Sequence, residues 1–116
     1  MILAEGYKRG LATICCLHSS IRQTAFSGTC YDNEYAPVLS QMPFMFGEFG
    51  ESVDGSDCTV TAVNTLMSWA DQHGAGYSAW DWDTWGGCLQ LITDYTTGNP
   101  DGNWGTAYKN HLASLP

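Results

Sequence analysis

The sequence predicts an α/β fold in which buried strands alternate with helices. Three short apolar runs are each followed by a polar loop and then by a segment with helical spacing. Continuous apolar runs are typical of strands covered on both faces, as in a parallel sheet. The alternation favours parallel strands joined by right-handed crossovers, and the loops after such strands are where these folds keep their chemistry.

The first predicted strand is Leu11–Leu17, which ends at His18 and is followed by the polar loop Ser19–Thr29. A helical segment then spans Tyr31–Gln41, because its apolar side chains recur at helical spacing. Pro37 lies inside this segment, so it either starts a second short helix or kinks the first.

The second predicted strand is Pro43–Glu48, which ends in a carboxylate. A longer helix follows, with Asp57 suited to cap its first turn and Gly74 suited to end it. The apolar face of this helix consists of Val60, Val63, Leu66, Met67 and Ala70. The third strand is Tyr77–Trp82, and after a long loop the last helix spans Trp104–Leu112.

The net charge argues against nucleic acid and membranes as partners, and the aromatic content is compatible with neutral sugars. The 4 basic and 12 acidic residues give a net charge of −8, which repels phosphate backbones and anionic lipid headgroups. No apolar stretch approaches the roughly 20 residues that span a bilayer. We therefore expect neither nucleic acid nor a membrane as a partner. The 5 Trp, 6 Tyr and 4 Phe residues either fill the core or provide flat platforms on which neutral sugars stack.

The 5 cysteines in this short acidic chain favour an oxidising, extracellular compartment. Lys8 and Arg9 precede the first apolar run, but that run is a buried strand and not a signal peptide in our interpretation. Cys15, Cys16 and His18 superficially suggest a metal site. Adjacent cysteines alternate faces on a strand and do not share a tetrahedral site easily, so we expect no metal and no cofactor.

The sharpest local motif is Gly47-Glu48-Phe49-Gly50, at the end of the second strand. A carboxylate at this position, with glycines on both sides, leaves room for a substrate to approach. Taken alone, a glutamate at a strand end is more often a solvated loop residue. Its neighbours along the chain decide between the two interpretations.

Together with these neighbours, the motif resembles the C-terminal portion of the catalytic domain of glycoside hydrolase family 5, the cellulase-like endoglucanases. The motifs occur in the family's order and are Ala36–Val38, Gly47–Gly50, Ser68–Gly74, Trp80–Asp83, Leu91–Tyr95 and Lys109–Leu112. The resemblance is strongest over residues 36–112. It implies that residues 1–116 are a C-terminal fragment of a (β/α)8 barrel, a partial TIM barrel of about three β/α units corresponding to strands six to eight.

The resemblance also implies a retaining hydrolase of O-glycosyl bonds that acts on a β-linked polysaccharide or oligosaccharide. It makes Glu48 the nucleophile and Trp80 the platform for the sugar at the cleavage point. Trp82 shares a face with Trp80, and it either lines the cleft above that residue or packs against a loop. His18 resembles the first residue of a substrate-binding His-x-Tyr motif, but Ser20 replaces the tyrosine, so His18 either binds substrate or is a structural histidine.

Two further pairs of residues follow from the same resemblance. Cys58 and Cys88 lie in loops that adjoin at a barrel mouth, and relatives carry cysteines at similar points, so these two are candidates for a disulfide. Asp81 and Asp83 stand where relatives have neutral residues. They either raise the pKa of a neighbouring acid or face solvent.

Retaining hydrolysis needs a second carboxyl group as acid and base, and the resemblance places that residue upstream of this chain. We therefore expect the isolated chain to be inactive on polysaccharide. The alternative is a noncatalytic, aromatic-rich carbohydrate-binding or degenerate domain. In a partial barrel, Phe44, Phe46 and Glu48 would face an open interior, and the open face and sheet edges predict self-association.

Overall fold

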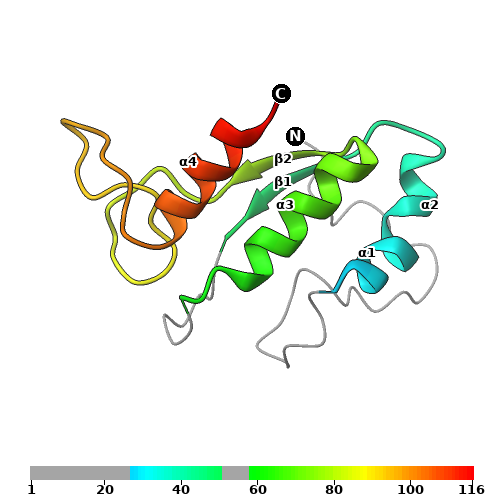
Figure 1. Cartoon of the computed structure of the whole chain (residues 1–116), viewed down its shortest axis with the longest axis horizontal. Helices are drawn as coiled ribbons and strands as arrows, with labels where there is room; N and C mark the ends of the chain where they lie inside the picture. The colour runs from blue at the N-terminus through cyan, green and yellow to red at the C-terminus, as the bar shows by residue number, and fades with distance from the viewer. Residues whose placement is uncertain (1–26, 51–57) are drawn as a thin grey trace. The chain divides into compact units, whose positions relative to one another are not determined.

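A computed structural model describes residues 27–50 and 58–116 (Figure 1). Its elements are α1 (Gly28–Glu34), α2 (Ala36–Leu39), β1 (Met45–Phe49), α3 (Thr61–His73), β2 (Gly76–Ala79) and α4 (Trp104–Ser114). The first predicted strand, Leu11–Leu17, lies outside the described residues, as does His18. Within the described ranges, no helix combines the length and apolar character that crossing a membrane requires.

The sheet in the described part of the chain has 2 strands, β1 and β2, which run parallel (Figure 1). The N–H of Gly76 donates to the carbonyl of Phe44 (3.0 Å), and the N–H of Trp80 donates to the carbonyl of Phe49 (2.7 Å). The expected partial TIM barrel of about three β/α units is therefore wrong for residues 27–50 and 58–116. A barrel wall needs strands that each have a neighbour on both sides, and this sheet is a single strand pair.

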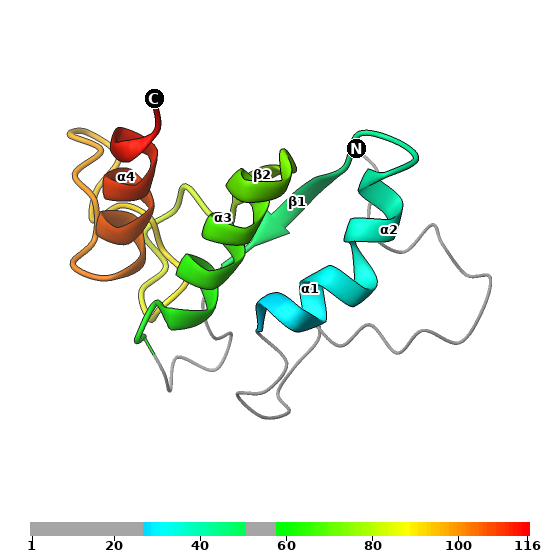
Figure 2. The same cartoon turned by 45° about the vertical axis from the view of Figure 1, so that its right-hand side comes forward.

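Two compact units divide the chain, Met1–Gly47 with Thr65–Ser78 and Glu48–Asn64 with Ala79–Pro116. In the first unit, three elements, α1, β1 and α3 (Figure 2), each contribute a ring to an aromatic cluster. The ring of Tyr31 lies 6.3 Å from Phe46 and 5.6 Å from Trp69, measured between centroids. All three side chains are buried. Burial, followed by the neighbouring Tyr35 phenol, raises the pKa of Tyr31.

The ring of Phe44, one residue before β1, packs against that of Phe46 on the strand, as their alternation predicts, but this face of the strand is not open. Phe46 is only 2% exposed and packs edge-on against Phe44 (4.9 Å) and Tyr35 (5.0 Å). The expectation that these rings line an open interior is wrong. Alternation says which side chains lie together on a strand, but it does not say which face the helices cover.

The helical segment that contains Pro37 is divided into two helices, α1 and α2. The side chain of Ser27 accepts a hydrogen bond from the N–H of Cys30 (3.2 Å) and so caps α1. Pro37 lies in the first turn of α2, where its missing N–H would have had no helical partner. Of the two alternatives for this proline, the second short helix is confirmed.

The end of α3 follows the sequence signal. Gly74 has a positive φ of 71°, and the N–H of Ala75 reaches back to the carbonyl of Ala70 (2.9 Å). Glycine adopts this left-handed conformation without strain, so it ends the helix and satisfies a carbonyl of the last turn. The predicted stop near Gly74 is confirmed, whereas the predicted cap, Asp57, lies outside the described residues.

The start of α4 is packed against the chain before it, within the second unit. The carboxylate of Asp101, which is 4% exposed, accepts a hydrogen bond from the N–H of Gly105 (2.5 Å). The same Asp101 donates its own N–H to the carbonyl of Leu91 (3.0 Å). A Cβ on Gly105 would come within 1.8 Å of that carbonyl oxygen. Only glycine therefore lets the helix approach Leu91 this closely.

A disulfide joins Cys58 to Cys88, with their Cα atoms 5.1 Å apart, and this confirms the predicted pair. The two cysteines belong to the second unit and are 30 residues apart in the sequence, so the bond closes a long stretch of chain that includes α3 and β2. Cys88 is fully buried. Cys30 is also disulfide-bonded.

Replacing Gly105 with alanine should destabilise the protein by about 3 kcal/mol, because the added methyl group overlaps a backbone carbonyl that cannot swing away. Gly102 is the matched control, since a Cβ there meets nothing within 4 Å. Gly102→Ala should change the free energy of unfolding by less than about 0.5 kcal/mol. Urea titration followed by circular dichroism measures both, and equal midpoints for the two variants would contradict the close approach.

Removing the Cys58–Cys88 bond should lower the free energy of unfolding by about 3.5 kcal/mol, the loop-closure entropy expected for its length. The double variant Cys58→Ala/Cys88→Ala suits the test, because alanine leaves no hydroxyl at the buried Cys88 position. Denaturant midpoints of this variant and of the oxidised chain give the difference. A loss below about 1 kcal/mol would mean that the bond does not constrain the unfolded chain.

Candidate functional site

The C-terminal end of β1 presents Glu48 to solvent. Glu48 is exposed, while the next residue, Phe49, is 6% exposed. The ring of Phe49 packs edge-on against Trp104 (5.2 Å) and Tyr108 (6.2 Å), both on α4. Because Phe49 is anchored in the apolar interior of the second unit, the backbone that carries Glu48 is fixed at the strand end.

Trp80 lies directly after β2 and is held beside the end of β1. Its N–H donates to the carbonyl of Phe49 (2.7 Å), and its own carbonyl accepts from the indole N–H of Trp104 (2.9 Å). A Cβ on Gly50 would lie 2.7 Å from the same Trp80 oxygen, so glycine permits the contact. The peptide bond between Trp80 and Asp81 is cis. The Trp80 side chain remains 40% exposed.

The structure thus brings two of the predicted site residues to one end of the sheet. Glu48 and Trp80 sit at the carboxyl ends of neighbouring parallel strands and belong to the same unit. Such an arrangement sets a solvent-facing carboxylate and a partly exposed aromatic ring on adjacent chain ends. Chemically, it offers a nucleophile or hydrogen-bond acceptor next to an apolar surface.

Asp81 and Asp83 do not both simply face solvent. One carboxylate oxygen of Asp81, Oδ1, is buried and has no hydrogen-bond partner among the described residues. Partial burial, reinforced by the negative charge of Asp83, raises the pKa of Asp81. Asp83 accepts a hydrogen bond from the N–H of Thr84 (2.5 Å). The acid whose pKa is raised is therefore Asp81, and after burial the neighbouring Asp83 is the cause.

Trp82 packs against a loop, which was one of the two alternatives for this residue. An added Cβ on Gly98 would lie 3.3 Å and 3.5 Å from two carbons of its six-membered ring. The indole is nevertheless 64% exposed. His18, the third predicted substrate-binding residue, lies outside the described residues.

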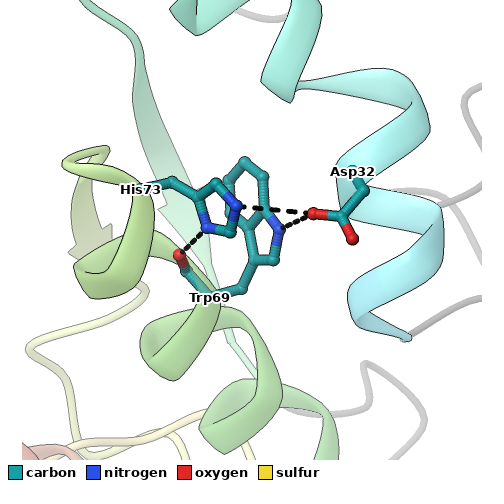
Figure 3. A network of polar contacts seen from close by, with 3 residues as sticks. All are labelled: Asp32, Trp69 and His73. Atoms are coloured by element: carbon teal, nitrogen blue, oxygen red, sulfur yellow. Dashed lines mark hydrogen bonds and ion pairs between the residues drawn. The ribbon is translucent and has the colours of Figure 1, made fainter.

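A polar network that the sequence did not suggest lies in the first unit (Figure 3). The indole N–H of Trp69 donates to Oδ1 of Asp32 (2.8 Å), and Nε2 of His73 lies 3.5 Å from the same oxygen. His73 also bonds through Nδ1 to the carbonyl of Trp69 (2.8 Å), and its ring stacks on the indole at 4.2 Å.

His73 and Asp32 are residue types found in catalytic acid–base pairs, but their contacts here are structural. A carbonyl oxygen accepts but never donates, so Nδ1 of His73 carries the proton in that bond. The other ring nitrogen faces Asp32. The Trp69 bond to Asp32 and the approach of His73 to the same oxygen thus link α1 to α3. The spacing of Trp69 and His73, one helical turn apart, was the only sequence signal for it.

Among residues 27–50 and 58–116, no three His, Cys, Asp or Glu side chains gather in a way that would hold a metal ion. Comparisons of the chain with protein-family models, with curated proteins and with solved structures found no match.

Proposed function

We propose that this chain carries the nucleophile of a retaining glycoside hydrolase of cellulase type, with Glu48 as the attacking carboxylate. The observation that carries the proposal is the pairing of the two strand ends. The Phe49–Trp80 hydrogen bond of 2.7 Å sets the exposed Glu48 next to a strand end that carries a partly exposed tryptophan. The resemblance over residues 36–112 assigns those two residues the same roles.

The chemistry of retention explains why these residue types belong together. The carboxylate attacks the anomeric carbon, the glycosidic C–O bond breaks, and a covalent glycosyl ester forms. Water later cleaves the ester, and the configuration is retained. An aromatic wall such as Trp80 holds the pyranose ring while it distorts towards the transition state.

A second carboxyl group must protonate the leaving oxygen and later activate water, and the resemblance places it outside this sequence. The 116-residue chain should therefore react only with glycosides whose leaving group needs no protonation. A β-linked glucan or related polysaccharide is the proposed substrate. We also propose secretion, which the Cys58–Cys88 disulfide and the acidic composition support.

The alternative is a carbohydrate-binding domain without catalysis. It is favoured by exposed rings in the second unit, since Trp82 and Tyr95 are 64% and 63% exposed. Such a domain would keep Trp80 as a sugar platform and would not need Glu48. Covalent labelling of Glu48 separates the two functions, because a binding domain forms no glycosyl ester.

Incubation with 2,4-dinitrophenyl 2-deoxy-2-fluoro-β-cellobioside should label Glu48 and no other carboxylate, because dinitrophenolate leaves without protonation. Glu48→Gln should reduce the labelling rate at least about 1,000-fold, as expected for loss of a nucleophile. Glu34→Gln, on α1, is the matched control and should label normally. Mass spectrometry of peptides locates the adduct. Label on any other carboxylate would contradict the assignment.

A further inference from the structure

A second exposed aromatic surface lies in the second unit, on the chain between β2 and α4 (yellow to orange in Figure 1). Asp81 closes the first loop of this segment, donating its N–H to the carbonyl of Leu89 (3.1 Å) and accepting from the N–H of Leu91 (3.0 Å). The disulfide at Cys88 restrains the same loop. Trp82 follows Asp81 directly, so it projects from a closed and covalently tethered loop.

The indole of Trp82 is supported from one side by the turn that ends at Gly98. Gly98 has a positive φ of 63°, and its Cα lies so near the indole that an added Cβ would be 3.3 Å from it. The turn is fixed by Asp94, whose carboxylate accepts from the N–H groups of Thr96 (2.9 Å) and Thr97 (2.8 Å). The Gly98 N–H donates to the carbonyl of Asp94 (3.1 Å).

Tyr95 belongs to the same turn. The negatively charged Asp83 carboxylate, in the Trp82 loop, is the main reason why the pKa of Tyr95 is raised. The phenol is 63% exposed. An exposed tryptophan and an exposed tyrosine are therefore held on two linked loops. A solvated side chain without such support would lose conformational entropy on binding a ligand, and this loss is reduced here.

We propose that Trp82, backed by Gly98 and accompanied by Tyr95, is a binding platform for a β-1,4-linked glucose oligosaccharide, separate from the Glu48 end of β1. The ligand class rests on the proposed function, whereas the position of the platform rests on the contacts around Trp82. In such a glucan all ring substituents are equatorial, so each pyranose presents a flat face of C–H groups. That face stacks on an indole, and the burial of both apolar surfaces drives binding.

The charges around the platform favour a neutral sugar over an ion. An anionic ligand is repelled by the net charge of −8. A cation would need free, accessible carboxylates as well as the ring face, but the Asp94 and Asp83 carboxylates accept hydrogen bonds within the protein, and Oδ1 of Asp81 is buried. Asp94 accepts hydrogen bonds from the Thr96 and Thr97 backbone, and hydrogen bonds from Thr97 lower its pKa. Asp83 accepts a hydrogen bond from the N–H of Thr84.

Titration of the 116-residue chain with cellohexaose, followed by calorimetry, tests the platform. Trp82→Ala should weaken binding about tenfold, whereas Trp82→Phe, which keeps a flat ring, should weaken it less than about threefold. Trp85→Ala is the matched control, because it removes an equally exposed indole from the same loop, and it should bind like the parent chain. Circular dichroism melts of each variant establish that the fold is kept.

The proposal is overturned if the parent chain does not bind cellohexaose or if Trp82→Ala binds it normally. It is also overturned if Trp85→Ala loses as much affinity as Trp82→Ala. Competition by tetramethylammonium, or weakening of binding by added salt, would instead identify a cation site and also overturn it. The outcome is independent of the nucleophile. Labelling at Glu48 without cellohexaose binding refutes only the platform, and binding through Trp82 without labelling refutes only the proposed function.

Discussion

The carbonyl group of Trp80 is the point on which the geometry of the second unit depends. It accepts the indole N–H of Trp104, while the N–H of the same residue bonds to Phe49. Gly50 approaches the carbonyl so closely that a side chain there would overlap it. One peptide group therefore joins the end of β1, the end of β2 and the start of α4. Because these three segments meet there, the backbone of Glu48 and that of Trp80 are positioned together.

The first unit depends on a different kind of interaction, the packing of aromatic rings. A single pair of parallel strands is weak by itself, so side chains must hold it against helices. Phe46 does this by contacting rings from α1 and α3, and the bond from Trp69 to Asp32 links those two helices. The rings that a barrel would turn inwards are used here to attach β1 to its helices. The alternation of residues correctly grouped Phe44 with Phe46, but the prediction that their face is open was wrong because helices cover it.

The sequence was informative where local chemistry decides the structure. Pro37 and Gly74 marked helix boundaries because each has a restricted or special backbone conformation, and the motif around Glu48 marked a strand end. It was not informative where distant segments meet. The contact between Trp82 and Gly98, and the approach of Gly105 to Leu91, depend on how loops pack, and no periodicity records that. The turn residues from Asp94 to Gly98 were the signal that, in retrospect, indicated a rigid loop.

The two proposed sites differ in what holds them, and this difference has a functional consequence. Glu48 is positioned by long-range contacts, through Phe49 to Trp104 and Tyr108 on α4. Trp82 contacts Gly98, which is distant in the sequence, but the turn that carries Gly98 is fixed by hydrogen bonds between residues only a few positions apart. A change at the end of β1 would act directly on the contacts that position Glu48, whereas the hydrogen bonds of this turn do not involve β1. We therefore expect the proposed sugar platform to be less sensitive to such a change than the proposed nucleophile.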